Sequence, residues 1–260
     1  MSDAWLRALV ALPFGLAIGS FMTVVTDRMP AKQSVVSPPS RCPGCGAAIA
    51  YRDNIPVVSW LLLRGRCRNC GERISVEYPL IELCTAALVV GGVAHFDRIW
   101  IGIMVAALLA MMPAICVIDI RHRIIPNKLM YPSLIGFPVY VVVAWLFHGG
   151  TDPVRAAEGF LLFGGGLFLV ALISRGMGMG DVKLAGIIGF VMGAIGLRYV
   201  GVAAGAAILL GGLGGVVALL SGRGRKSAIP FGPYLAAGAV VAAFFTEPIA
   251  DWYLQRFLTP

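Results

Sequence analysis

The stretch Gly176-Met177-Gly178-Met179-Gly180-Asp181-Val182-Lys183-Leu184 places a carboxylate directly after three alternating glycines, where a long apolar run begins. A second carboxylate, Asp119, lies at the end of another apolar run and is followed by a short basic turn and Pro126. Ionisable groups at membrane depth are energetically costly, and for that reason they are functional candidates. The two aspartates are therefore the first candidates for a functional site.

The composition indicates a polytopic membrane protein. Hydrophobic residues make up 58% of the 260 residues, charged residues only 13%, and the mean hydropathy is +0.85. A soluble domain carries about 25% charged residues. The long uninterrupted apolar runs do not fit the alternating strands of a membrane β-barrel, and roughly 20 apolar residues cross a bilayer as a helix. We therefore expect an all-α bundle of eight transmembrane helices, at residues 6–26, 78–96, 100–118, 129–147, 155–173, 182–197, 199–220 and 232–250.

The formal net charge is +8, and the distribution of the basic residues along the chain agrees with the expected topology. If the first helix runs from outside to inside, only five of the 21 Lys and Arg lie outside: Arg7, Arg98, Arg155, Arg198 and Arg256. The positive-inside rule then places both termini on the outer side. Because topology explains the basic balance, we expect membrane lipid as the surroundings and no nucleic-acid partner.

Residues 28–77 form the only long polar segment, between a first helix within 1–27 and a helical core at 78–260. It contains Cys42-Pro43-Gly44-Cys45 and Cys67-Arg68-Asn69-Cys70, and each C-x-x-C motif can supply two thiolates to tetrahedral zinc. The alternative, a pair of disulfides, is disfavoured in a reducing inner loop. Because four cysteines close the coordination shell, we expect a structural zinc and not a hydrolytic one.

Counting crossings places Asp119 and Asp181 on the same inner face of the membrane. Two interpretations are open: an aspartyl catalytic pair, or interfacial aspartates that pair with neighbours such as Arg121 or Lys183. Glu82 lies one turn into the next helix and either pairs with a loop arginine or serves a site.

Glycine-rich stretches elsewhere predict close helix contacts. They are Gly15 with Gly19, then Gly164-Gly165-Gly166, and Gly211-Gly212-Leu213-Gly214-Gly215.

Taken together, these residues resemble the bacterial type IV prepilin peptidases. The resemblance covers nearly the whole chain, and it rests on an ordered series of motifs. They are Gly19-Ser20-Phe21, Cys42-Pro43-x-Cys45-Gly46, Asn54-Ile55-Pro56, Arg64-Gly65-Arg66-Cys67, Tyr78-Pro79 with Glu82, Ile118-Asp119, Gly178-x-Gly180-Asp181-x-Lys183 and Pro230-Phe231-Gly232-Pro233-Tyr234.

The resemblance implies a GxGD-type aspartic endopeptidase of the bacterial inner membrane, with periplasmic termini. It would remove the leader of type IV prepilins or type II secretion pseudopilins, after a glycine, at the cytoplasmic face. Asp119 and Asp181 correspond to the catalytic pair, with Gly178, Gly180 and Lys183 as support in the catalytic loop. Two close carboxylates share a proton, so one can activate water while the other polarises the scissile carbonyl.

Relatives with the four-cysteine insert commonly also methylate the new N-terminal residue, using S-adenosylmethionine. For this chain that second activity rests on the resemblance alone, since the sequence has no dinucleotide-binding fingerprint. Gly65 and Glu82 are the candidate residues for the methyl-donor site. Asn127, where many members carry Asp, is a departure that removes a charge but no catalytic group.

Three alternatives are open at this point. The chain could be a peptidase without methyl transfer, an ion-coupled transporter with carboxylates in its bundle, or a non-catalytic assembly factor that docks a partner through residues 28–77. Transporter sites lie near the membrane midplane between repeats. Here both aspartates lie at one interface and the sequence shows no repeat, which favours the peptidase.

Overall fold

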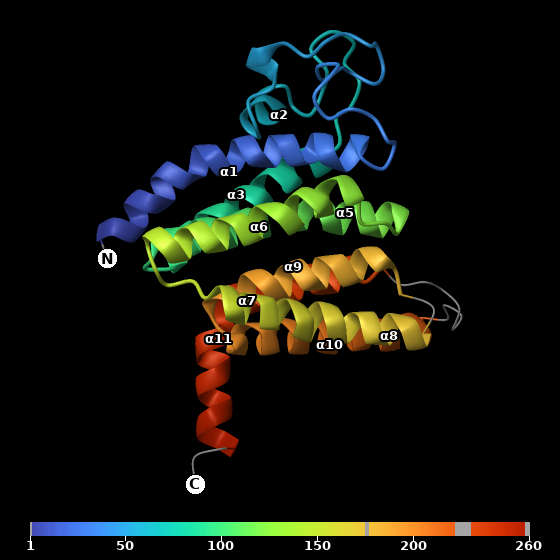
Figure 1. Ribbon diagram of the computed structural model, residues 1–260. Coiled ribbons are helices and arrows are strands. Elements are labelled where there is room, and N and C mark those ends of the chain that lie inside the picture. The colour runs from blue at the N-terminus through green and yellow to red at the C-terminus, as the bar shows by residue number, and fades with distance from the viewer. Residues whose placement is uncertain (1, 175–176, 222–229, 258–260) are drawn as a thin grey trace.

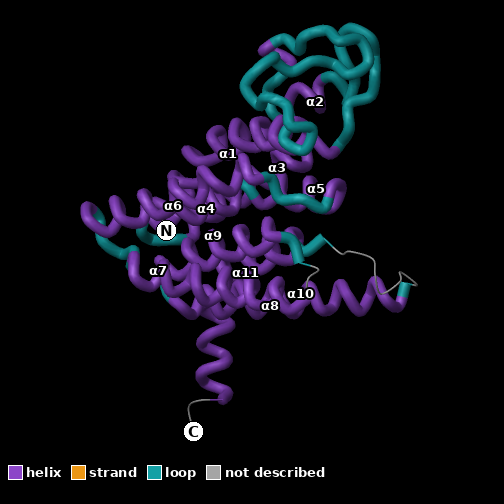
Figure 2. The backbone as a smooth tube through the Cα atoms, turned by 45° about the vertical axis from the view of Figure 1, so that its right-hand side comes forward, coloured by secondary structure: helices purple, strands orange, loops and turns teal. Residues whose placement is uncertain are grey.

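The computed structural model describes residues 2–174, 177–221 and 230–257. Apart from two isolated β-bridges, every element of secondary structure in these ranges is a helix. The all-α prediction is confirmed. The long helices lie side by side, and the polar segment forms a separate lobe beside α1 and α3 (Figures 1 and 2). The elements of the bundle are α1 (Ser2–Arg28), α3 (Glu77–His95), α4 (Ile99–Ala110), α5 (Met112–His122), α6 (Asn127–Phe147), α7 (Pro153–Gly159), the π-helix η2 (Phe160–Gly165), α8 (Gly166–Ser174), α9 (Met179–Ile195), α10 (Leu197–Leu220) and α11 (Gly232–Phe257).

Seven helical stretches among the described residues are long and apolar enough to cross a membrane. They correspond to seven of the eight predicted spans, with α4 and α5 forming one stretch, Ile99–His122, and α7, η2 and α8 forming another, Pro153–Ile173. The eighth prediction, residues 182–197, corresponds to α9, a helix of 17 residues. Such a helix is about 26 Å long, at the lower limit for a bilayer.

Helix α9 lies inside the bundle and is held there by glycines. Ten of its residues are buried, from Leu184 to Ala194. Gly159 and Gly189 face each other so closely that a Cβ on either would collide with the carbonyl oxygen of the other. A Cβ on Gly164 would lie 2.7 Å from the Cα of Gly186. Small residues let backbones approach in this way, and packing of that kind holds helices together in lipid.

The predicted glycine contacts are confirmed in part. A Cβ on Gly15 would lie 2.9 Å from the Cα of Ala86, and one on Gly19 would lie 2.7 Å from the Cα of Glu82, so α1 packs tightly on α3. Gly165 and Gly166, in contrast, have no neighbouring atom within 4 Å of a built Cβ. Within that triplet only Gly164 makes the contact.

One end of the bundle gathers the elements that matter for the site. The end of α5 and the beginnings of α6, α9 and α11 lie together on the right of Figure 1, whereas the first and last described residues lie towards the other end. Asp119 lies inside α5, one turn before its end at His122. The predicted boundary, a span ending at residue 118, was therefore too early.

The Gly159–Gly189 contact gives a test of the packing. We expect Gly189→Ala to destabilise the protein by about 1–3 kcal/mol, as overpacking does, because the new Cβ meets a backbone carbonyl that cannot rotate away. Gly201→Ala is the matched control, since a Cβ there meets nothing within 4 Å. Thermal unfolding in detergent measures both, and equal stability of the two variants would contradict the packing.

Candidate aspartyl pair and metal centre

Asp119 is held in a buried position near the end of α5. Only 4% of the residue is exposed, and its Oδ2 accepts a buried hydrogen bond from the backbone N–H of Gly232, with an N···O distance of 2.8 Å. A Cβ on Gly232 would lie 2.8 Å from the same Oδ2, so glycine is required for this approach. Gly232 was not among the predicted site residues, and its only signal was its place in the motif Pro230-Phe231-Gly232-Pro233.

Asp181 lies in the first turn of α9, after the N-cap residue Gly178. Its backbone N–H donates to the carbonyl oxygen of Gly178 at 3.1 Å. Gly180 packs against the turn between α5 and α6, where a Cβ would lie 2.9 Å from the Cβ of Ile125. Asp181 and Asp119 are close enough for their negative charges to repel each other. The structure therefore places the two predicted aspartates within electrostatic range of each other, whereas Gly176 lies outside the described residues.

Neither aspartate is paired with a cation in the part of the chain that the structure describes. Arg121 forms its ion pair with Glu77. The Nζ of Lys183 donates to Asn127 Oδ1 at 2.7 Å and to the Tyr131 hydroxyl at 3.2 Å. The interpretation of Asp119 and Asp181 as ion pairs with Arg121 or Lys183 is therefore wrong. Lys183 instead ties the first turn of α9 to α6.

The four cysteines of the polar segment form one cluster. The Sγ atoms of Cys42, Cys45, Cys67 and Cys70 all lie within 4.8 Å of one another, and the Cys42 and Cys70 sulfurs are 3.7 Å apart. Four thiolates bound tetrahedrally to zinc at about 2.3 Å lie about 3.8 Å apart. The donor set and its spacing therefore fit a tetrahedral zinc ion with no open position.

Both cysteine motifs fold in the same way. In the first, Cys42 N–H donates to Ala47 O and Gly46 N–H donates to Cys42 O; in the second, Cys67 N–H donates to Glu72 O and Gly71 N–H to Cys67 O. Gly46 and Gly71 have φ of 69° and 74°, a conformation that favours glycine. Hydrogen bonds from the backbone N–H groups of Cys70 and Asn69 lower the pKa of Cys67 to about 7, which favours the thiolate that binds metal.

The segment that carries the cysteines has almost no apolar core. Within residues 29–76 only Cys42, Ser59 and Gly65 are buried. A unit of this size without a core needs a staple such as a metal. The cluster is placed where such a metal would connect the two motifs.

The two candidates for a methyl-donor site lie in different surroundings. Gly65, with φ of 65°, packs on the ring of Trp60, where a Cβ would lie 2.9 Å from Cζ2. The indole Nε1 donates to the carbonyl oxygen of Ile74 at 3.1 Å. The carboxylate of Glu82 accepts the backbone N–H of Val57 at 2.7 Å, and it forms no ion pair with an arginine in the described part of the chain. Both residues contact the short helix α2 (Val58–Leu62) or the residue before it.

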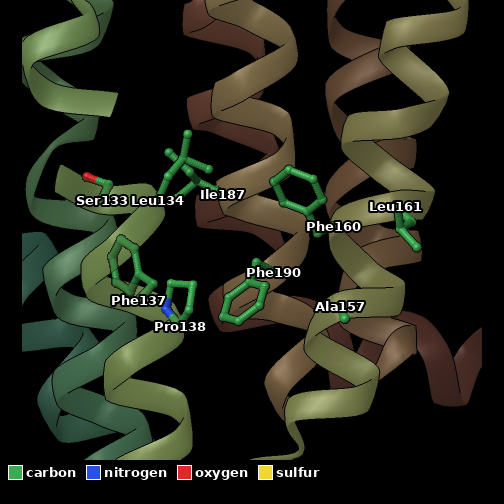
Figure 3. Close-up of a pocket in the computed structure, with 9 residues that line it drawn as sticks. All are labelled: Ser133, Leu134, Phe137, Pro138, Ala157, Phe160, Leu161, Ile187 and Phe190. Carbon is green, nitrogen blue, oxygen red and sulfur yellow. The ribbon is translucent and has the colours of Figure 1, made fainter. Parts of the chain in front are cut away.

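An apolar cavity of about 340 Å³ opens between α6, α7–η2 and α9 (Figure 3). Phe137, Phe160, Ile187 and Phe190 line it, and Ser133 is its only side chain with an oxygen atom. Because no titratable group lines it, this cavity is not a candidate for the catalytic chemistry.

Comparison with known proteins supports the same two regions. Residues 14–96 match the bacterial peptidase A24 N-terminal domain, and residues 106–220 match the type IV leader peptidase family. The prepilin leader peptidase/N-methyltransferase of Bacillus subtilis (strain 168) is 31% identical over 94% of this chain and 97% of that protein. The chain belongs to the type IV leader peptidase family. Proteins with the same description from Aeromonas hydrophila and Burkholderia pseudomallei (strain 1026b) are 33% and 34% identical, covering 98% and 92% of the chain and 96% and 85% of the relatives. No solved structure was found to match the chain significantly.

Membership of the type IV leader peptidase family confirms the resemblance seen in the sequence. Asp119 and Asp181 lie inside the leader peptidase match, whereas the four cysteines, Gly65 and Glu82 lie inside the N-terminal match. The family favours a peptidase over the transporter and assembly-factor alternatives.

The cysteine cluster gives a second test. We expect purified protein to contain one zinc ion per chain and Cys42→Ser to contain less than a tenth of that, because three thiolates and a hydroxyl hold zinc poorly. Metal analysis by mass spectrometry measures the content. Cys84→Ser is the control, since Cys84 lies outside the cluster. Full zinc content in Cys42→Ser would refute the site.

Proposed function

We propose that this chain is a prepilin leader peptidase that also methylates the new N-terminus, and that Asp119 and Asp181 are its catalytic pair. The observation that carries the proposal is that the carboxylates of Asp119 in α5 and Asp181 in α9 lie within electrostatic range of each other, and that neither pairs with a cation among the described residues. Carboxylates are expensive at membrane depth, so an uncompensated pair needs a function.

The proposed chemistry is that of an aspartic protease. Two neighbouring carboxylates do not both ionise easily, so the pair shares one proton. The ionised member takes a proton from water, which attacks the scissile carbonyl, while the protonated member hydrogen-bonds to the carbonyl oxygen. The pair titrates as a unit, so the two roles belong to Asp119 and Asp181 together.

The residues around the pair would position it. The N–H of Gly232 fixes the orientation of the Asp119 carboxylate. Gly180 allows the start of α9 to approach Ile125, and Lys183 anchors the same turn to Asn127 and Tyr131. We propose Gly178, Gly180 and Lys183 as positioning residues, since none of them supplies the reacting carboxyl groups.

The proposed organisation follows the charge pattern. Residues 1–27 would form the first transmembrane helix, 28–77 a cytoplasmic four-cysteine domain, and 78–260 the membrane core with the catalytic pair. The inner bacterial membrane, with both termini periplasmic, is supported by the basic residues of the loops at the Asp119 end. Prepilins and pseudopilins are the proposed substrates, and they would reach the pair laterally from the membrane.

Two cofactors complete the proposal. Zinc held by Cys42, Cys45, Cys67 and Cys70 would cross-link the four-cysteine domain. S-adenosylmethionine would supply the methyl group, as the N-methyltransferase descriptions of the relatives suggest. For its site we propose the region around α2, which Gly65 contacts through Trp60.

Substitution of the pair tests the peptidase. We expect Asp119→Asn and Asp181→Asn each to lower leader cleavage at least about 1,000-fold, because neither amide can exchange the shared proton. Mass spectrometry of a prepilin substrate measures cleavage, and zinc content and thermal unfolding show whether the fold is kept. Asp97→Asn, at an exposed position outside the pair, is the control. If a folded Asp119→Asn or Asp181→Asn enzyme cleaves the leader at the normal rate, the aspartyl mechanism is wrong.

Methyl transfer has a separate test. We expect Gly65→Ala to reduce methylation while cleavage stays near normal, because the new Cβ displaces the Trp60 ring but lies in a different domain from the aspartates. Labelled S-adenosylmethionine and mass spectrometry follow both products in one reaction. Gly149→Ala is the matched control, with the same φ of 65° and no atom within 4 Å of a Cβ. Cleavage by the unaltered enzyme without any methylation would instead favour the alternative, a peptidase alone.

A further inference from the structure

The four-cysteine lobe carries a basic cleft beside the region proposed for the methyl donor, and neither proposed activity uses the arginines of this cleft. The cleft has a volume of about 530 Å³ and is lined by three arginines, Arg64, Arg66 and Arg73, and by Trp60 and Gly65. Among the described residues none of these three arginines forms an ion pair. By contrast Arg68, in the same lobe, pairs with Asp53 at 2.6 Å and lowers the pKa of that carboxyl. The cleft therefore presents three guanidinium groups without a counter-charge.

The charge of the cleft selects an anionic ligand. Residues 28–77 contain eight Lys and Arg but only three Asp and Glu. The acidic residues of the lobe are therefore too few to neutralise its positive charge. Guanidinium groups match phosphate oxygens in geometry and charge.

The position of the cleft places it at a membrane surface. Ile74, Ser75 and Val76 line it, and the membrane-crossing helix α3 begins at the next residue, Glu77. Three residues span at most about 10 Å, so the cleft lies within that distance of the start of a span. In Figures 1 and 2 the lobe lies against the ends of α1 and α3.

Helix α2 adds an apolar surface beside the cleft. Leu61 and Leu62 are 61% and 77% exposed, and Val58 is 46% exposed. Exposed leucines next to arginines and a tryptophan are typical of segments that lie in the lipid interface. Inorganic phosphate has no apolar part that could contact these leucines, whereas a phospholipid has acyl chains.

We propose that this cleft binds the headgroup of an anionic phospholipid of the adjacent leaflet, and that Leu61 and Leu62 enter its acyl boundary. The three arginines hold the phosphate, and the lobe is thereby fixed to the membrane surface through α2. This docking is independent of the aspartyl chemistry, because it uses no residue of the pair.

The first experiment uses the unaltered full-length protein in two kinds of nanodisc. One contains phosphatidylcholine alone, and the other also contains phosphatidylglycerol. We expect amide hydrogen exchange in residues 60–66 and 73–76 to slow several-fold with phosphatidylglycerol, while residues 41–53 exchange equally in both. Equal exchange of the cleft segments in the two discs would overturn the proposal. Equal protection from inorganic phosphate added to phosphatidylcholine discs would also overturn it, since it would show a site for free phosphate.

A matched pair of variants separates the cleft from general charge. Arg64→Gln with Arg66→Gln and Arg73→Gln removes three charges from the cleft, and Lys32→Gln with Arg41→Gln and Arg52→Gln removes three from elsewhere in the lobe. Native mass spectrometry measures retained phosphatidylglycerol. Since each basic side chain at a membrane surface contributes about a fivefold change, we expect about a hundredfold weaker binding in the first variant. An equal loss in both variants would refute a specific site, and the exchange comparison decides even if one variant fails to fold.

Discussion

The contact between α9 and the α7–η2 stretch is the constraint that positions the end of the bundle carrying Asp119 and Asp181. Lipid tails are as apolar as leucine, so helices in a membrane associate by packing and not by escape from lipid. Gly159, Gly164, Gly186 and Gly189 let the two backbones meet where any side chain would collide. Because α9 carries Asp181 in its first turn, this contact determines where one of the two carboxylates lies.

Two further close contacts position the elements around Asp119 relative to α9. Gly180 rests on Ile125, in the turn that follows Asp119, and Gly232 places the N-terminus of α11 on the Asp119 carboxylate. The three contacts bring α5, α9 and α11 together around two carboxyl groups, which are costly to bury in an apolar bundle. Native proteins break the rules of stable packing at functional sites, and the proposed catalytic pair would be such a site.

The four-cysteine lobe follows a different physical principle. It has few buried residues, so its order depends on the cysteine cluster and on turns that both motifs repeat. It contacts the bundle through a hydrogen bond from the N–H of Val57 to Glu82, and through Met29 and Val35, which pack on an apolar cluster of α1, α3 and α5. A lobe with so few buried residues would gain stability from the proposed zinc site and from the proposed attachment to the membrane surface.

The sequence by itself determined the features that depend on local pattern. Apolar runs predicted the helices, because a bilayer demands about 20 residues per span, and the spacing of Cys42, Cys45, Cys67 and Cys70 predicted their cluster because each turn supplies two thiols. It misjudged the end of α5, where polar residues extend the helix past Asp119, but it correctly made the segment that forms α9 the shortest of the predicted spans.

Only the tertiary structure decided which distant residues meet. Lys183 contacts Asn127 and Tyr131, not Asp181; Gly232 meets Asp119 from 113 residues away. Glu82 accepts a backbone N–H and not an arginine. Pairings of this kind depend on how the helices pack against one another, and hydrophobicity within one segment carries no information about them.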